Sequence, residues 1–279
     1  MDTVIQLWPG LRRNSHKLPL PTPTSLTRAS MSRLQDQYVV GLKNDGVRHV
    51  ALLFFDDQIN YVKLLNRKGR ETFQRLIEGN EDVWHGTLLD VEVMPDKSWV
   101  LLDVMAYGGY SYINESFADR LAKVTNELIQ LLATAGITLR RKTWHPLKNI
   151  YHLDLDDTAD GLIFMPTHLP IRIGRHTNMF KWKPTHTIDM VWLNGHFRCM
   201  TKQGPQPLKG MEYEGIGNDL VENTVYEFEV VSEFKCRVMF ARDDKHIPNF
   251  ITTVQDCIQC AKEKVTLEEL RFHVKQQNV

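Results

Sequence analysis

Five short motifs follow one another along the chain, and their side chains can do chemistry together. One nucleophilic amine, several carboxylates for a metal ion and cations for a triphosphate are present among them. Covalent nucleotidyl transfer needs this set of groups. The motifs are Lys43-Asn44-Asp45-Gly46-Val47-Arg48, Asp90-Val91-Glu92, Asp160-Gly161-Leu162-Ile163-Phe164, Lys181-Trp182-Lys183-Pro184 and Arg242-Asp243-Asp244-Lys245-His246-Ile247-Pro248-Asn249.

Lys43 is the candidate nucleophile. A lysine must be neutral when it attacks, and desolvation or neighbouring cations favour the neutral form. Asp45-Gly46 predicts a tight turn directly after it, and Arg48 is placed to reach back towards the lysine from the next strand. Taken alone, however, a lysine before Asn-Asp-Gly is also typical of an ordinary turn beside a strand.

The carboxylates come from two strands. Asp90 and Glu92 are two residues apart, so both side chains lie on one strand face and can bind Mg²⁺ or Mn²⁺, or accept hydrogen bonds from a ribose. Asp160 precedes an apolar strand, which suits a metal ion that bridges an α-phosphate and the lysine. The alternative for the first pair is a solvated sheet edge.

Cations come from two further places. Lys181 and Lys183 alternate with Trp182, so the two lysines share a strand face and can hold an α-phosphate; a solvated strand is the alternative. Arg242, Asp244 and Lys245 form a later cluster whose cations can hold β- and γ-phosphates. Because this cluster lies in a separate unit, we expect it to reach Lys43 only by domain closure.

The elements expected to position these residues form an α+β fold: a larger domain with antiparallel sheets and helices, plus a small OB-fold β-barrel domain. Prolines at positions 19, 21 and 23 predict a loop-rich lead-in over residues 1–37. One helix is expected from an N-cap at Asn114 to a stop at Gly136. Apolar patterns predict strands at 38–40, 50–55, 61–65, 88–94, 100–105, 161–164 and 179–183. A turn is expected at 56–60, so the strands at 50–55 and 61–65 should pair as a hairpin.

A second unit begins near Thr185. Strands at 187–192, 196–201, 225–231 and 236–242 favour a small antiparallel barrel. The C-terminus reads as helical, with a capping box formed by Thr266 and Glu269. The expected domains are therefore residues 1–185, 186–251 and a helical segment at 252–279.

Composition sets broad limits. The chain has 279 residues and a formal net charge of zero, so a nucleic acid would be bound by a local basic groove. No apolar run reaches transmembrane length, and no secretory signal is recognisable. Four scattered cysteines favour an intracellular, reduced protein without membrane attachment. Cys257 and Cys260 are interpreted as ordinary helix residues, the alternatives being half a metal site or a redox pair.

In order and spacing, the motifs resemble those of the lysine-dependent nucleotidyltransferase superfamily, and within it the GTP:RNA guanylyltransferases that cap messenger RNA. The resemblance spans roughly residues 38–253, with Leu101-Leu102-Asp103 similar to motif IIIa. It implies a lysyl-GMP at Lys43 and a divalent metal, Mg²⁺ or Mn²⁺, as cofactor. The implied contacts are Arg48 with the sugar, Glu92 and Asp160 with ribose and metal, Lys181 and Lys183 with the α-phosphate, and Arg242, Asp244 and Lys245 with the leaving pyrophosphate.

Two positions depart from the family pattern. Val91 replaces a glycine in motif III, and Leu102 replaces the aromatic residue that stacks on the base in motif IIIa. Base stacking then passes to an aliphatic surface or to another aromatic residue such as Trp99.

The implied partners are GTP and RNA with a 5′-diphosphate end. RNA triphosphatase and cap methyltransferase activities are expected on other polypeptides or on parts of the protein outside this sequence, and RNA polymerase is a further expected partner. The expected location is the nucleus or a viral replication compartment. Two rivals stay open: an ATP-dependent polynucleotide ligase, and a non-catalytic RNA-binding module on the same fold.

Overall fold

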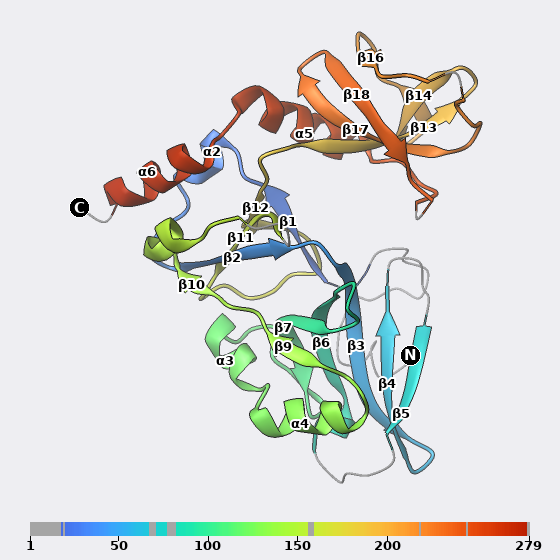
Figure 1. The fold of residues 1–279 in the computed structure, drawn as a ribbon. Helices are drawn as coiled ribbons and strands as arrows, with labels where there is room; N and C mark the ends of the chain where they lie inside the picture. Colours follow the sequence, from blue (N-terminus) through green and yellow to red (C-terminus); the bar gives the residue numbers. More distant parts are fainter. Residues whose placement is uncertain are drawn as a thin grey trace. The chain divides into compact units, whose positions relative to one another are not determined.

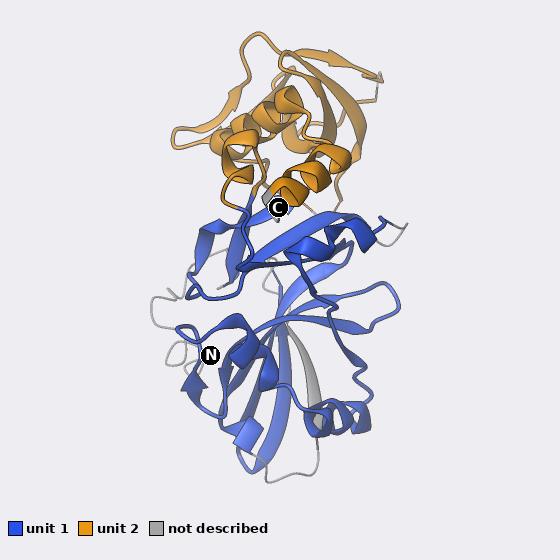
Figure 2. Cartoon of the chain, turned by 90° about the vertical axis from the view of Figure 1, so that its left-hand side faces the viewer, with its two compact units in different colours: residues 1–24, 34–181 blue, residues 25–33, 182–279 orange. Residues whose placement is uncertain are grey.

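The computed structural model divides into two compact units (Figures 1 and 2). It describes residues 18, 20–66, 71–76, 82–155, 159–217, 219–243 and 245–277. Unit 1 contains residues 1–24 and 34–181, and unit 2 contains residues 25–33 and 182–279. Both units mix strands with helices, in agreement with the predicted α+β class.

The larger sheet of unit 1 is built around a strand hairpin. Strands β3 and β4 are joined at Asp57 and Gln58, whose φ angles of 45° and 63° match the turn type that two-residue hairpins favour. This confirms the hairpin predicted there. The sheet order is β5-β4-β3-β6-β7-β8, with β9 parallel to β7. The strands are β3 Val47–Asp56, β4 Ile59–Leu65, β5 Glu71–Leu76, β6 Thr87–Val93, β7 Trp99–Tyr107, β8 Tyr110–Ser111 and β9 Leu139–Arg141.

The second sheet of unit 1 has five strands in the order β1-β12-β11-β2-β10. They are β1 Pro21–Ser25, β12 Gly174–Trp182, β11 Ala159–Pro166, β2 Tyr38–Asn44 and β10 His145–Pro146. The lead-in is therefore less irregular than predicted, since β1 and helix α2 (Arg28–Met31) both form within it. Proline is excluded from central strands but tolerated at a sheet edge, and β1 is an edge strand.

The single helix predicted from Asn114 is wrong. Two helices form instead, α3 (Phe117–Ala122) and α4 (Asn126–Thr134). Ser116 caps the first by accepting from the amide of Asp119, and Thr125 caps the second through the amide of Leu128. A threonine that caps a new helix competes with continuation of the old one. Gly136, at φ 75°, follows α4 as expected.

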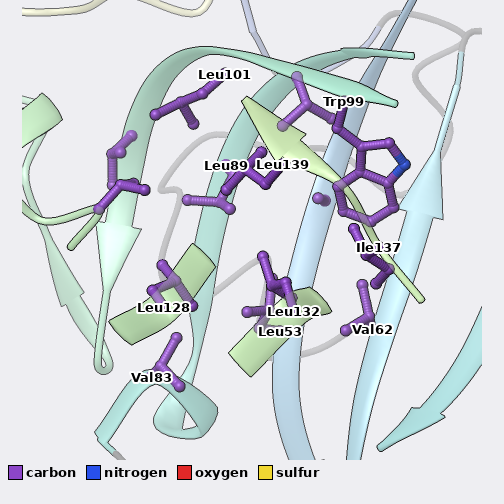
Figure 3. Close-up of a cluster of buried hydrophobic side chains, with 14 of the residues drawn as sticks. Leu53, Val62, Val83, Leu89, Trp99, Leu101, Leu128, Leu132, Ile137 and Leu139 are labelled. Carbon is purple, nitrogen blue, oxygen red and sulfur yellow. The ribbon is translucent and has the colours of Figure 1, made fainter. Parts of the chain in front are cut away.

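Apolar side chains from α4 and β9 pack on the larger sheet and form the main core of unit 1 (Figure 3). Leu128 and Leu132 come from α4, and Leu139 comes from β9. Trp99 belongs to this core and is only 5% exposed. Because core side chains enclose its ring, Trp99 cannot stack on a nucleotide base, as the sequence analysis had suggested it could.

Unit 2 has one six-stranded sheet in the order β15-β14-β13-β17-β18-β16, followed by two helices. The four predicted strands are confirmed, and β15 and β16 are additional. Over the described residues, the strand pairing is an open path, so the expected closed barrel is not confirmed. The elements are β13 Thr187–Leu193, β14 His196–Thr201, β15 Gly204–Pro207, β16 Glu212–Glu214, β17 Val225–Ser232, β18 Lys235–Ala241, α5 Ile251–Glu263 and α6 Leu267–Gln277.

Residues 25–33 belong to unit 2 because they contact its C-terminal helices. The Arg28 guanidinium donates to the Glu263 carbonyl at 3.0 Å, and the Cys260 thiol faces the Leu26 carbonyl. Cys257 and Cys260 are buried helix residues, as predicted, and burial raises the pKa of Cys260 to about 12. No helix in the described part of the chain is long and apolar enough to cross a membrane.

Candidate active site

Lys43 lies near the end of β2, and its amine meets a carboxylate from a distant motif. Lys43 Nζ donates to Asp160 Oδ1 at 2.7 Å, across 117 residues of sequence. The two side chains are 25% and 28% exposed, so both remain accessible to a ligand. The first and third motifs therefore converge on one point.

A β-bulge in β11 aims Asp160 at the lysine. Asn44 pairs with Ala159 and Leu42 pairs with Leu162, so two residues of β11 stand opposite Lys43 alone. A bulge of this kind redirects a side chain and is frequent beside active sites. The second of the two residues is Gly161, whose φ of 154° suits glycine.

Gly46 lets the turn after Lys43 approach the carboxylate of Glu92. A Cβ at position 46 would lie 2.7 Å from the Glu92 side chain and 2.8 Å from the Val93 carbonyl oxygen, so only glycine fits there without displacement. The Gly46 amide donates to Glu92. Burial raises the pKa of Glu92, and the charges of Lys43 and Lys142 oppose that rise.

Asp90 has a different role from the one predicted for the Asp-x-Glu pair. Its buried carboxylate is held by Arg48 through two hydrogen bonds, one of them from Nε at 2.8 Å. Arg48 Nη1 also donates to the Pro21 carbonyl at 2.8 Å. In this structure Asp90 serves to hold the Arg48 guanidinium. The guanidinium has five N–H donors, and its contacts with the described residues use three of them.

The motif IIIa aspartate is also committed to an ion pair. Asp103 stands opposite Asp90 in the β6–β7 register and receives two hydrogen bonds of 2.9 Å from Arg120 in α3. Each side chain of this pair is 1% exposed. Burial raises the pKa of Asp103 to about 6, although Arg120 lowers it. Arg120 was missed, yet it lies on the apolar stripe of its helix, three residues after Phe117.

Lys142 is a second cation at the site that the sequence did not reveal. Its Nζ donates to Asn44 Oδ1 at 2.5 Å and to the Leu42 carbonyl. The pKa of Lys142 falls to about 8, because burial and the charge of Lys43 lower it by more than the Glu92 carboxylate raises it. Lys142 follows two arginines in a polar stretch. Such a stretch is typical of a solvated segment, so the sequence did not indicate that this lysine is buried beside Lys43.

Lys181 and Lys183 flank a buried tryptophan. Trp182 is 4% exposed, and its Nε1 donates to the Val265 carbonyl at 2.8 Å within unit 2. Strand β12 runs from Gly174 to Trp182, so the strand expected over 179–183 begins five residues too late and ends one residue too late. The unit boundary falls between Lys181 and Trp182. Convergence of the two lysines on Lys43 remains a prediction.

Arg242 and Lys245 are drawn together by one buried carboxylate of unit 2. Arg242 Nη1 lies 3.3 Å from Asp189 Oδ1, and the Lys245 ammonium contacts Asp189 Oδ2. Arg242 also contacts Glu227. Asp189 thus organises this cluster. Asp244 lies outside the described residues.

Asp189 is itself held by Asn249, the last residue of the motif that contains Arg242 and Lys245. Its amide donates to Asn249 Oδ1 at 2.9 Å, and the Asn249 amide donates back to the Asp189 carbonyl at 2.8 Å. This reciprocal pair closes the segment that follows β18 onto β13. The final motif therefore folds against its own unit.

Asp160 and Glu92 are the residues that can hold a divalent metal. The described residues contain no cluster of three or more His, Cys, Asp or Glu side chains with metal-binding geometry. Mg²⁺ commonly uses one or two carboxylates together with substrate phosphates and water, so two carboxylates near Lys43 fit such an ion. An open depression of about 280 Å³ in unit 2 is lined by α2 and α6 residues and includes none of the motif side chains.

Comparison with known proteins agrees with the motif pattern. Residues 4–185 match the family described as mRNA capping enzyme, catalytic domain. An mRNA-capping enzyme of Caenorhabditis elegans is 23% identical over 305 aligned residues, covering 91% of this chain and 48% of the relative. The chain thus spans about half the length of that relative.

Solved structures with a similar arrangement include DNA ligases. A mycobacterial DNA ligase D complexed with ATP and MES is 13% identical, covering 84% of this chain and 97% of that one, with a TM-score of 0.44. The ATP-dependent DNA ligase from bacteriophage T7, in complex with ATP, is 11% identical, covering 84% and 98%, with a TM-score of 0.44. Since the capping-enzyme match covers well over half of the sequence, the chain belongs to the mRNA capping enzyme catalytic-domain family.

Proposed function

We propose that this chain is a GTP:RNA guanylyltransferase. Lys43 attacks the α-phosphorus of GTP, a Nζ–P bond forms, and pyrophosphate leaves. The 5′-diphosphate end of an RNA then attacks the lysyl-GMP, which releases Lys43 and forms the 5′–5′ cap. The observation that carries this proposal is the 2.7 Å contact between Lys43 and Asp160.

The first step requires Lys43 to lose a proton. Asp160 Oδ1 is hydrogen-bonded to the amine and is therefore placed to hold that proton as the amine turns towards phosphorus. The contact is about one quarter exposed, so a triphosphate can displace it without opening the core. Mg²⁺ or Mn²⁺ bound by Asp160 and Glu92 would neutralise phosphate charge.

Cations of the other motifs would orient the nucleotide. Lys181 and Lys183 hold the α-phosphate, and Arg48 uses its remaining N–H donors on the sugar. Arg242, Asp244 and Lys245 orient the leaving pyrophosphate after unit 2 closes over the nucleotide, with the two cations making the contacts to phosphate. Asp189 keeps Arg242 and Lys245 together before closure, so less ordering is needed when the triphosphate binds.

The proposal includes the finer architecture and the partners. Strands within residues 186–251 form an OB-fold, residues 1–185 the nucleotidyltransferase domain, and residues 252–279 a helical appendage. The RNA substrate would receive its 5′-diphosphate from a separate RNA triphosphatase. A cap methyltransferase and RNA polymerase are further partners, in the nucleus or a viral replication compartment.

A labelling experiment tests the function. The protein is incubated with GTP or ATP, each labelled at the α-phosphate, with Mg²⁺, and then denatured and separated on a gel. We expect label from GTP to stay bound, and mass spectrometry to locate GMP on the peptide that contains Lys43. Stable label from ATP instead would indicate a polynucleotide ligase. No stable label from either nucleotide would favour a non-catalytic RNA-binding module.

A further inference from the structure

The segment 139–146 connects the two sheets of unit 1 and passes beside the candidate nucleophile. At its start, β9 pairs with β7 of the larger sheet; at its end, β10 pairs with β2 of the smaller one. Between them, the Lys142 amide donates to the Leu101 carbonyl at 3.3 Å. A Cβ at Gly41 would lie 3.0 Å from the Thr143 carbonyl oxygen, so the segment runs close against β2.

The Lys142 side chain turns towards β2 and holds the two residues that flank Lys43. Its ammonium donates to the Leu42 carbonyl oxygen, just before the nucleophile, and to Asn44 Oδ1, just after it. On the opposite side of β2, the bulge of β11 supplies the Asp160 contact. The end of β2 is therefore held from both neighbouring segments, one through a cation and one through a carboxylate.

We propose that Lys142 is a positioning residue for Lys43: it fixes the backbone on both sides of the nucleophile through the Leu42 carbonyl and the Asn44 side chain. This inference rests on the proposed role of Lys43. An amine attacks phosphorus in line with the leaving group, and misplacement by about 1 Å can cost roughly 100-fold in rate. Burial of the Lys142 ammonium, reflected in its lowered pKa, fits a fixed tether better than a solvated surface charge.

Hydrogen exchange tests the tether without relying on activity. Lys142→Met keeps most of the length of the side chain but cannot donate a hydrogen bond. Loss of a charged hydrogen bond should speed exchange of the amides in a peptide spanning residues 38–47 about tenfold or more. Peptides from β17 in unit 2 serve as an internal reference for global stability.

A neighbouring cation provides the matched control. Arg140 pairs with Asp96 at 2.7 Å, and both side chains are more than half exposed. Arg140→Met removes one positive charge two residues from Lys142 without touching β2. We expect it to leave exchange of residues 38–47 unchanged. Equal exchange in wild type and Lys142→Met, or equal acceleration in both variants, would overturn the tether.

Single-turnover kinetics test whether the tether serves the reaction. Lys142→Met should lower the maximal rate of adduct formation by about 100-fold and change the half-saturating GTP concentration by less than about threefold. A Lys142 that bound the nucleotide itself would instead show its main effect in that concentration. The second pattern would overturn the positioning role.

A double-mutant cycle with Asn44 identifies the route. Asn44→Leu removes one of the two acceptors of Lys142, so it should lower the maximal rate of adduct formation by a smaller factor than Lys142→Met. If both residues act through one tether, the double variant should lower that rate by less than the product of the two single factors. Strictly multiplicative losses would contradict the proposal. Absence of any adduct in wild type would instead refute the guanylyltransferase function, while hydrogen exchange still decides the tether.

Discussion

Two ion pairs of unit 1 use the same chemistry in opposite surroundings. Lys43 and Asp160 approach to 2.7 Å, and Arg120 and Asp103 approach to 2.9 Å. The first pair is 25% and 28% exposed, whereas each member of the second is 1% exposed. A partly exposed pair contributes little to stability and is easily exchanged for a ligand, but breaking a buried pair leaves an uncompensated charge.

Burial of the side chain separates the roles of two similar aspartate motifs. Asp103 and Asp160 both lie in aspartate-containing motifs that resemble those of nucleotidyltransferases. From the sequence alone, either aspartate could serve the reaction. Their burial separates them, since one connects β7 to α3 and the other faces the candidate nucleophile. Asp189 in unit 2 lies between these extremes: it is buried, yet the two cations that it pairs with are partly exposed.

The largest expected effect is on the exposed pair. Lys43→Arg keeps the positive charge, but arginine does not lose its proton usefully and cannot attack phosphorus. We expect adduct formation to fall by at least ~1,000-fold, below detection on a denaturing gel. Lys148→Arg, at an exposed position of the same unit, is the control and should label normally. A normal adduct in Lys43→Arg would refute Lys43 as nucleophile.

Stability measurements should separate the two pairs directly. Arg120→Leu leaves the Asp103 carboxylate buried without its cation and should lower the free energy of unfolding by about 3–5 kcal/mol. Asp160→Asn, in the exposed pair, should change it by less than about 1 kcal/mol. Urea unfolding followed by far-UV circular dichroism measures both. Similar losses in the two variants would remove the basis of the comparison.

The lysines flanking Trp182 test whether further cations serve the exposed site. Lys181→Ala and Lys183→Ala should each slow adduct formation by at least ~100-fold, the scale of losing a preorganised charge at a reacting centre. Melting temperatures should change little, because the buried Trp182 between them is retained. Near-normal rates in both variants would identify these lysines as a solvated strand end.

The cluster around Asp189 is needed, in our proposal, only while a triphosphate is bound. Arg242→Ala or Lys245→Ala should slow lysyl-GMP formation by roughly ten-fold or more, as expected for loss of a charge contact. Transfer of GMP from preformed lysyl-GMP to RNA should be much less affected. Quenched time courses of the separate half-reactions measure this. An equal loss of rate in both half-reactions would assign the cluster to RNA binding or to stability of the fold.

The smallest expected effect concerns the pH dependence of stability. Burial lowers the pKa of Lys142 from 10.5 to about 8, so between these values the unfolded chain binds the proton that the folded chain has lost. Stability from this group therefore rises as pH increases from about 8 to 10.5. Wild type should gain on the order of 1 kcal/mol relative to Lys142→Met over that range. A constant difference between the two would show that Lys142 is not desolvated.

Patterns that depend on neighbours in sequence were predicted well. Alternating apolar residues gave most strands, and the turn residues gave the β3–β4 hairpin. The family membership followed from motif order, because that signal does not depend on distances in space. Boundaries that depend on a cap were less secure: Thr125 divides one apolar repeat into two helices.

Other features were decided only by the tertiary structure. Residues 25–33 join unit 2 because its C-terminal helices offer them partners, and β1 forms because a sheet edge accepts its prolines. The bulge that aims Asp160 exists only when β11 pairs with β2. Lys142 looks like a surface cation in the sequence, and the partner of Arg120 on a neighbouring strand cannot be found from its helix alone. Burial beside a specific carboxylate or backbone carbonyl is a long-range property, and it determines which charges hold the fold and which remain available at the candidate active site.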